Sequence, residues 1–321
     1  MEDKATRDVV RTPDLADPEL TKFIAEFNAM NLPPAAEAGA DALRSASLER
    51  VRSRPKGPEL DSVDDVTIGS RGPAVRVYRP RPGPSGVVVY FHGGGWVFGD
   101  LETHDRACRR LAASSGVVVV AVDYRRAPEH PWPAAVVDGI AVMQWIATEP
   151  DVLGDLNGRA GVGGDSAGGL LAALVSHQLR DESPDLLPAA QFLIYANTDL
   201  ASTGGSMVSE AHGYGLDVAD IEWFNDQWVP DRTRWSDPHV SPLHASSFAG
   251  LPATFVITCE HDPLRDQGEE YSRRTERSGV PTLLRREPGL VHNFMLWDLV
   301  SPACAAAADR VANDIATSLA H

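Results

Sequence analysis

The stretch AGVGGDSAGGLLAALVSHQLRDE (160–182) decides the fold of this chain. It begins as a short strand, continues as a helix, and joins the two through Gly164-Asp165-Ser166-Ala167-Gly168. A G-x-S-x-G run between a strand and a helix predicts a strained turn that exposes a nucleophilic serine. Glycines on either side remove Cβ atoms that would clash in so tight a turn, and the helix dipole favours negative charge at the serine. The alternative, a glycine-rich turn whose serine only caps the helix, fits this context less well.

Outward from this turn, strand-like and helix-like segments alternate. Strands are expected at 65–70, 74–80, 86–91, 117–124, 160–164, 191–196, 253–260 and 281–288. Helices are expected at 106–114, 134–148, 166–182, 267–278 and 302–320. The first two strands form a hairpin, and the rest predict a mostly parallel eight-stranded sheet flanked by helices on both faces.

Two regions interrupt this alternation. Residues 1–55 carry two helical patterns, Leu20–Met30 and Ala35–Arg52, separated by prolines. Residues 199–247 form a long insertion between two strands. Long excursions inside a compact domain are usually lids or binding elements, so both regions are predicted to form a helical cap over the carboxyl ends of the strands. The α/β core then comprises residues 56–198 and 248–321.

A second glycine motif follows the strand at 86–91. His92-Gly93-Gly94-Gly95-Trp96 exposes backbone amides and lets a substrate approach closely, as a tetrahedral oxyanion requires. The amide of Ala167, directly after the serine, is a further expected donor. A phosphate-binding loop is the weaker reading, because neither G-x-x-x-x-G-K-[ST] nor a helix-opening G-x-G-x-x-G is present. His92 itself is expected to anchor the loop by hydrogen bonding.

A serine nucleophile of this kind needs a histidine downstream, with an acid between them. Seven histidines follow Ser166: His177, His212, His239, His244, His261, His292 and His321. His292 stands just past the last predicted strand, where a loop can carry it over the turn. His261 abuts the strand at 253–260 and is its only real competitor. The others lie in a predicted helix, in the insertion or at the terminus, where surface or packing roles are expected.

The acid is expected at the end of the same strand, in Cys259-Glu260-His261-Asp262. We predict Asp262, with Glu260 as the alternative, because strand alternation points both side chains the same way. Asp262 also suits a helix N-cap before Leu264, and it can serve both purposes. The acid would hold the imidazole in one tautomer and stabilise its cation.

Composition excludes several classes of protein. The 321 residues carry a formal charge of −16, which disfavours nucleic acids and anionic membranes as partners. The three cysteines stand far apart, without a metal-binding pattern or a readable disulfide framework. The first twenty residues lack the apolar core of a signal peptide, and no apolar run reaches the ~18 residues of a membrane span. We therefore expect a cytoplasmic protein that needs no cofactor.

Several segments together resemble the hormone-sensitive-lipase family of carboxylesterases. They are HGGGW (92–96), DYRRAPEHPWPAA (123–135), GDSAGG (164–169), CEHDPLRDQG (259–268) and GLVHNF (289–294). The resemblance implies the α/β-hydrolase fold and hydrolysis of short- to medium-chain carboxylic esters through Ser166, Asp262 and His292. It also implies oxyanion donors at Gly94, Gly95 and Ala167, with Gly93 as support. Tyr124, Arg125, Pro128 and Glu129 read as residues that brace the site.

The substrate pocket is less determined by the resemblance. Ala196 stands where many members have proline, and the segment 213–228 matches loosely. Four aromatic residues could line the pocket or merely pack the cap: Trp96, Trp223, Phe224 and Trp228. Lactonase, amidase and lipase activities use the same triad, and a ligand-binding protein on this fold is a weaker alternative because the triad is complete. Family members are often dimers, so a homodimer is one expected assembly.

Overall fold

The computed structural model describes residues 15–70, 72–80, 85–148, 151–154 and 158–320. The expectation of no signal peptide rested largely on residues 1–14, and these residues and His321 lie outside the described ranges.

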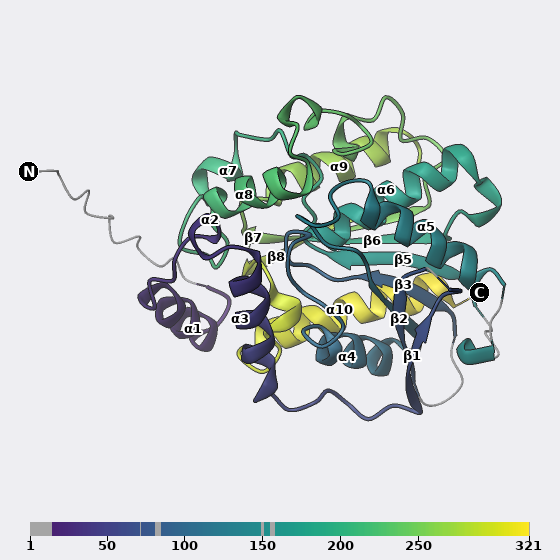
Figure 1. Cartoon of the computed structure of the whole chain (residues 1–321), viewed down its shortest axis with the longest axis horizontal. Helices are drawn as coiled ribbons and strands as arrows, with labels where there is room; N and C mark the ends of the chain where they lie inside the picture. Colours follow the sequence, from purple (N-terminus) through teal and green to yellow (C-terminus); the bar gives the residue numbers. More distant parts are fainter. Residues whose placement is uncertain (1–14, 71, 81–84, 149–150, 155–157, 321) are drawn as a thin grey trace, which may run out of the picture.

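Eight strands form one sheet in the order β1-β2-β4-β3-β5-β6-β7-β8 (Figure 1). The strands are β1 (Ser62–Thr67), β2 (Ala74–Arg79), β3 (Val87–Phe91), β4 (Val118–Asp123), β5 (Ala160–Asp165), β6 (Ala190–Ile194), β7 (Ala253–His261) and β8 (Thr282–Val291). β2 pairs antiparallel with both β1 and β4, and all other pairs are parallel. The predicted mostly parallel eight-stranded sheet is therefore confirmed.

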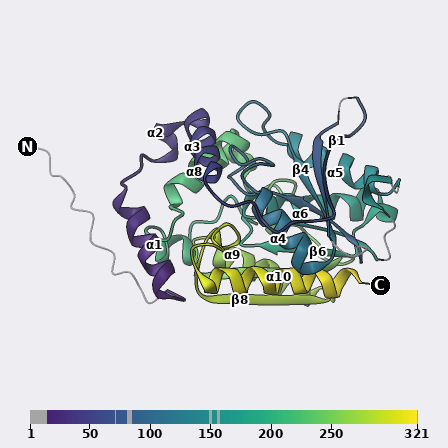
Figure 2. The same cartoon turned by 90° about the horizontal axis from the view of Figure 1, so that it is seen from below.

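Helices cover both faces of this sheet. The helices of the core are α4 (Asp105–Ser115), α5 (Ala134–Ile146), α6 (Ala167–Glu182), α9 (Arg265–Arg277) and α10 (Pro302–Leu319). α4 and α10 pack together on one face, whereas α5, α6 and α9 cover the other (Figures 1 and 2). Each face has its own apolar cluster, because alternate residues of the central strands point to opposite sides.

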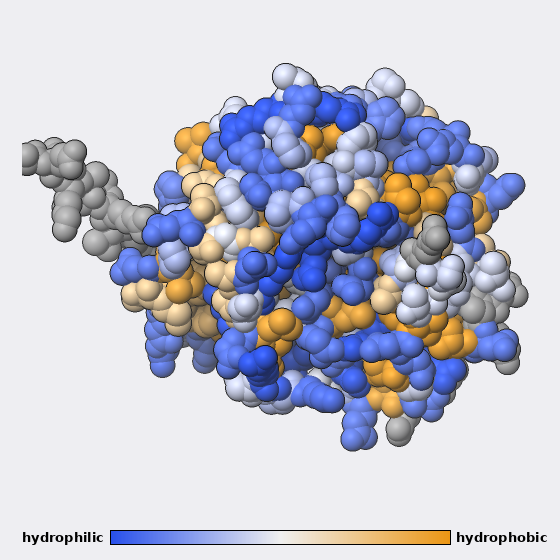
Figure 3. Space-filling model, viewed as in Figure 1, coloured by the Kyte–Doolittle hydropathy of each residue, from blue (hydrophilic) through white to orange (hydrophobic). Residues whose placement is uncertain are grey.

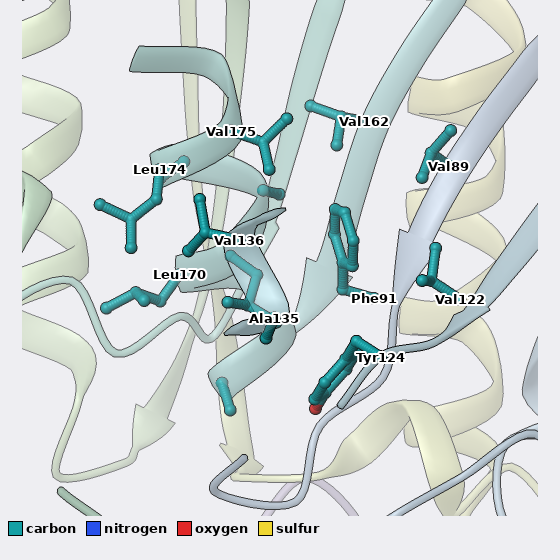
Figure 4. Close-up of a cluster of buried hydrophobic side chains, with 14 of the residues drawn as sticks. Val89, Phe91, Val122, Tyr124, Ala135, Val136, Val162, Leu170, Leu174 and Val175 are labelled. Carbon is teal, nitrogen blue, oxygen red and sulfur yellow. The ribbon is translucent and has the colours of Figure 1, made fainter. Parts of the chain in front are cut away.

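The valine-rich strands explain why both faces are covered. Figure 4 shows Phe91 of β3 and Val162 of β5 beside Val136 of α5 and Val175 of α6. The five residues of β3 are all buried, without the polar alternation of a strand that has one face in water. Such strands fold only where helices exclude water from both sides. In Figure 3, hydrophilic residues cover most of the outer face in view, with apolar patches scattered between them.

The N-terminal segment contains α1 (Pro18–Ala29), α2 (Ala35–Ala38) and α3 (Ala40–Arg52). The prediction of a single helix over 35–52 is wrong, because Gly39 has φ +78° and ends α2 before α3 begins. Asp17 connects the N-terminal segment to the core, because its carboxylate binds backbone N–H groups at the starts of two helices. One of its carboxylate oxygens accepts the N–H of Leu20 in α1 at 2.7 Å, and the other accepts that of Ala303 in α10 at 3.0 Å.

The insertion after β6 contains α7 (Ser206–Ser209), α8 (Val218–Trp228) and the short 3-10 turns Arg232–Arg234 and Pro242–His244. Both views place α8 beside the N-terminal helices at one end of the molecule (Figures 1 and 2). The N–H of Ala35 in α2 donates to Asp220 in α8 at 2.7 Å, which joins the two segments directly. No helix within the described ranges is long and apolar enough to cross a membrane.

Candidate active site

Ser166 occupies the sharp turn between β5 and α6. Its backbone has φ 55° and ψ −120°, a left-handed conformation that is strained for a residue with a side chain. The turn packs against the end of β3 so closely that Cβ atoms at Gly164 and Gly168 would lie 2.4 Å and 1.9 Å from the carbonyl oxygen of Phe91. The two glycines of the motif are therefore required by the neighbouring strand as well as by the turn itself.

A continuous chain of hydrogen bonds runs from this serine into the protein. The Nε2 atom of His292 lies 2.9 Å from Oγ of Ser166, and its Nδ1 atom lies 2.8 Å from Oδ2 of Asp262. Asp262 is fully buried, and its other oxygen accepts the N–H of Leu264 at 2.8 Å. With Nδ1–H donated to this carboxylate, the lone pair of Nε2 faces the serine hydroxyl. This is the arrangement that removes a proton from a nucleophile.

Strand ends bring these side chains together. β5, β7 and β8 are parallel, so their carboxyl ends meet at one edge of the sheet. The last strand is longer than expected and runs to Val291, which leaves His292 directly at its end. A register shift between Cys259 and His261 adjusts the pairing just before Asp262.

The alternative acid and base have other partners. Glu260 accepts the N–H of Gly289 at 2.7 Å and thereby holds the strand that precedes His292. His261 stacks on Tyr214, with ring centroids 5.0 Å apart, and its Nδ1 lies 3.3 Å from a carboxylate oxygen of Glu210. Both residues therefore hold segments next to the site through these contacts. His177 is buried in α6 and contacts the hydroxyl of Tyr271, while the remaining described histidines after Ser166 pair with aspartates of the insertion: His212, His239 and His244.

The glycine loop after β3 is held by the residue that precedes the nucleophile. Gly93 donates its N–H to Oδ1 of Asp165 at 3.1 Å, and Tyr90 donates its hydroxyl to the same oxygen at 2.9 Å. Burial alone would raise the pKa of Asp165. The charge and hydrogen bond of His104, together with the hydrogen bond from Tyr90, keep that pKa below the ordinary value. The amide of Gly93 therefore supports the loop, whereas Gly94 and Gly95 line the pocket beside the serine.

His92 anchors the loop as expected. Its Nδ1 atom lies 2.8 Å from the carbonyl oxygen of Gly93, and its own carbonyl accepts the hydroxyl of Tyr124 at 2.9 Å. Burial, reinforced by the neighbouring His104, lowers the pKa of His92 to about 3. The ring is thus neutral at ordinary pH and holds backbone groups without adding charge to the site.

Arg44 of α3 braces the same loop from the N-terminal segment. Its Nε–H donates to the carbonyl of Val97 at 2.9 Å, and its guanidinium also donates to the carbonyl of Ala127 at 2.9 Å. A bidentate ion pair with Glu129, at 2.8 and 2.7 Å, fixes the orientation of the Arg44 guanidinium. The hydrogen bond from Arg44 lowers the pKa of Glu129 to about 2. Sequence reasoning missed Arg44, because no local pattern distinguishes it from other helix arginines.

A small pocket opens in front of the serine. Its lining residues come from the glycine loop, the serine turn, the insertion and the segment after β8: Gly94, Gly95, Trp96, Phe98, Ser166, Ala167, Asn197, Leu216, Ile221, Phe224, Asn225, Leu264, His292 and Asn293. Two of the four aromatic residues singled out above, Trp96 and Phe224, are among them. Trp228 instead stacks behind Trp96 at 4.3 Å, and Trp223 packs against the edge of Phe224 at 5.4 Å.

Gly95 is placed so that α8 leaves no room for a side chain. A Cβ atom there would lie 2.4 Å from the Phe224 ring, and the residue has φ +57°. We predict that the amide of Gly95 is an oxyanion donor. Because the loop must shift in Gly95→Ala, we expect this variant to lower kcat by about 100-fold, the effect of losing one such donor. Steady-state hydrolysis of p-nitrophenyl butyrate measures this. Gly204→Ala, with nothing within 4 Å of the new Cβ, is the matched control; equal rates for the two variants would contradict the expectation.

No group of three or more His, Cys, Asp or Glu side chains within the described ranges could hold a metal ion. The cysteines Cys108, Cys259 and Cys304 are all buried and free. The site itself offers an oriented hydroxyl, an imidazole and backbone amides.

The chain is similar to several known proteins. A family described as alpha/beta hydrolase fold matches residues 88–296. LipN, a carboxylic ester hydrolase of Mycobacterium tuberculosis, is 40% identical over 249 residues, which cover 74% of this chain and 66% of LipN. The carboxylesterase NlhH of the same organism is 36% identical over 319 residues, or 95% of this chain and 96% of NlhH. The solved ester hydrolase EH1AB1 from the metagenome of Lake Arreo, complexed with a derivative of bipyridine phosphonate, superposes with a TM-score of 0.86 at 36% identity, covering 94% of this chain and 98% of that one.

Proposed function

The chain belongs to the α/β-hydrolase family, in its hormone-sensitive-lipase branch, and from that premise we propose how its residues hydrolyse carboxylic esters. It is a serine carboxylesterase. The observation that carries the assignment of its residues is the unbroken hydrogen-bond chain from Ser166 through His292 to Asp262, at 2.9 and 2.8 Å.

In the proposed reaction, Oγ of Ser166 attacks the ester carbonyl while Nε2 of His292 takes the hydroxyl proton. Asp262 holds the ring and stabilises the imidazolium that forms. The negative oxygen of the tetrahedral intermediate accepts hydrogen bonds from the amides of Gly94, Gly95 and Ala167. The amide of Ala167 is suited to this, because it is the first residue of α6 and has no preceding helical carbonyl to bond.

Collapse of this intermediate breaks the bond to the alcohol oxygen, which leaves with the proton held by His292. An acyl-enzyme remains on Ser166. Water then attacks the acyl carbonyl with His292 again taking the proton, and the carboxylic acid leaves as Ser166 regains its hydrogen. This sequence needs no metal or organic cofactor, because the serine hydroxyl, the imidazole and the attacking water supply every proton and electron pair.

We propose that the N-terminal helices and the insertion form one cap over this site. Arg44 of α3 and Phe224 of α8 both contact the glycine loop, so each segment reaches the same part of the site. Phe224, Ile221 and Leu216 of the insertion supply much of the apolar wall. So tight a pocket suits acyl chains of short to medium length, with Trp96 and Phe224 at the wall and Trp228 and Trp223 supporting them.

The charge of the chain and its thiols support a proposal for the partners and the compartment of the enzyme. The formal charge of −16 disfavours nucleic acids and anionic lipid surfaces as partners, and small ester molecules are the substrates that the pocket fits. Buried free thiols are typical of a reducing compartment, which supports a cytoplasmic location.

Hydrolysis of a p-nitrophenyl ester series from acetate to palmitate tests the proposal. We expect the highest kcat/KM at short to medium chain length and a steep fall toward palmitate. Covalent labelling by a fluorophosphonate, located by mass spectrometry, should modify Ser166. Highest activity on palmitate would indicate a lipase, whereas absence of both labelling and turnover would indicate a binding protein.

A further inference from the structure

The pocket contains a polar corner made of two buried amide side chains. Asn197 follows β6, and Asn225 lies in α8; they are 4% and 2% exposed. The Nδ2 atom of Asn197 donates to Oδ1 of Asn225 at 3.2 Å, and both residues line the pocket together with Ser166. Neither residue belongs to the hydrogen-bond chain proposed for catalysis.

The hydrogen bonds determine how these amides are oriented. The Nδ2 atom of Asn225 is directed to the carbonyl of Leu200 at 3.4 Å, which turns its oxygen toward Asn197. Asn197 must then present its NH₂ group to Asn225, so its own oxygen faces elsewhere. This Oδ1 atom is buried and has no hydrogen-bond partner among the described residues. A buried acceptor without a partner is unfavourable, and any group that donates to it is correspondingly favoured.

A plain hydrocarbon chain leaves that acceptor unpaired. Much of the remaining wall is apolar: Trp96, Phe98, Leu216, Ile221, Phe224 and Leu264. A substrate that carries a hydroxyl or an amide N–H can satisfy Asn197 while its carbon atoms contact these residues. Because Asn197 lines the same small pocket as Ser166 and Ala167, the donor must lie within a few bonds of the reacting carbonyl.

Resting on the proposed ester hydrolysis, we propose that Asn197 determines substrate preference. It selects esters that carry a hydrogen-bond donor close to the scissile carbonyl over hydrocarbon esters of the same size. The pair with Asn225 holds the Asn197 amide in the orientation that leaves its oxygen available to substrate.

Two pairs of substrates test this in the wild-type enzyme. On the acyl side, p-nitrophenyl 3-hydroxybutyrate is compared with p-nitrophenyl butyrate; on the alcohol side, 2-hydroxyethyl butyrate is compared with ethyl butyrate. Each kcat/KM is divided by the rate constant for hydroxide hydrolysis of the same ester. We expect the hydroxylated ester to be favoured about ten-fold in one pair, which is the effect of one hydrogen bond to a buried group. The favoured pair identifies the side of the substrate that meets Asn197.

Asn197→Leu, which has a similar volume and no polar atoms, should reduce that ratio to near one. Asn313→Leu, on the exposed side of α10, is the matched control and should keep the wild-type ratio. Ratios near one in both wild-type pairs, or a ratio unchanged in Asn197→Leu, would overturn the inference. The wild-type comparison needs no variant, so ratios near one overturn the inference even if Asn197→Leu does not fold. Hydrolysis of butyrate esters without preference removes only this inference, whereas failure to hydrolyse any ester removes the proposed function.

Discussion

Replacing Ser166 by alanine is expected to reduce kcat/KM for p-nitrophenyl butyrate by on the order of a million-fold, to the background rate. The variant loses the only hydroxyl that contacts His292 in the described structure. What remains, the backbone amides and the pocket, can bind and polarise an ester without forming an acyl-enzyme.

The fold should survive this substitution. Ser166 is followed directly by α6 but makes no side-chain capping bond to it, and alanine keeps the same Cβ atom in the same strained backbone. Thermal unfolding monitored by circular dichroism should therefore give a midpoint close to that of the wild type. Turnover above background by a folded variant would exclude Ser166 as the nucleophile. Loss of fluorophosphonate labelling in the variant gives independent evidence on the same point.

Replacing His292 by asparagine is expected to lower kcat by several orders of magnitude, on the order of 10⁴-fold or more. His292 is 2% exposed and contacts both the serine hydroxyl and the buried Asp262 carboxylate. Asparagine can still bond to the carboxylate but cannot accept the serine proton. Steady-state rates on p-nitrophenyl butyrate measure the loss.

His261→Asn is the matched control for this experiment. His261 is only one residue from Asp262 and was the competing base in the sequence, but its contacts are with Tyr214 and Glu210. We expect its substitution to change kcat by no more than a few-fold. The opposite pattern, in which His261→Asn abolishes turnover and His292→Asn does not, would transfer the role of base to His261.

Asp262, the residue proposed as the acid, uses both of its carboxylate oxygens. Asp262 binds the ring of His292 with one oxygen and the backbone of Leu264 with the other. The second bond fixes the carboxylate just before α9 begins, so the carboxylate needs little reorganisation when the imidazole becomes charged. The prediction that Asp262 is a helix N-cap is wrong, because α9 begins at Arg265 with Leu264 as its N-cap and no side-chain capping bond; the bond from Leu264 to Asp262 closes the turn before the helix.

The cap predicted from residues 1–55 and 199–247 is joined to the site by contacts that cross large distances in the sequence. Arg44 reaches the glycine loop at Val97, and Asp220 of the insertion accepts the N–H of Ala35. Movement of either segment would thus disturb the other and the glycine loop together. This connection is a physical reason to regard the two segments as one cap.

The sequence alone predicted the order of the strands and core helices along the chain, and it predicted the candidate catalytic residues. Valine-rich runs such as 117–124 indicate strands buried on both faces, and Gly164 and Gly168 around Ser166 indicate a turn without room for side chains. These signals are local, because strand periodicity and turn chemistry depend on neighbouring residues. The same locality explains why the helix predicted over 35–52 missed its break: a single Gly39 with positive φ has little effect on the helical pattern.

Which side chains from distant parts of the sequence contact one another depends on the tertiary structure. The sequence left His261 as an alternative base and Glu260 as an alternative acid. In the structure β7 and β8 pair in parallel, and His292 and Asp262, which follow their ends, lie within hydrogen-bond distance of each other. Three features had no sequence signal: the hydrogen bonds from Arg44 to the glycine loop, the oxygen of Asn197 that has no partner among the described residues, and the hydrogen bond from the N–H of Gly93 to Asp165. Each depends on where a loop or helix from elsewhere in the chain comes to rest, and that position follows from packing of the whole core, which no short pattern of residues records.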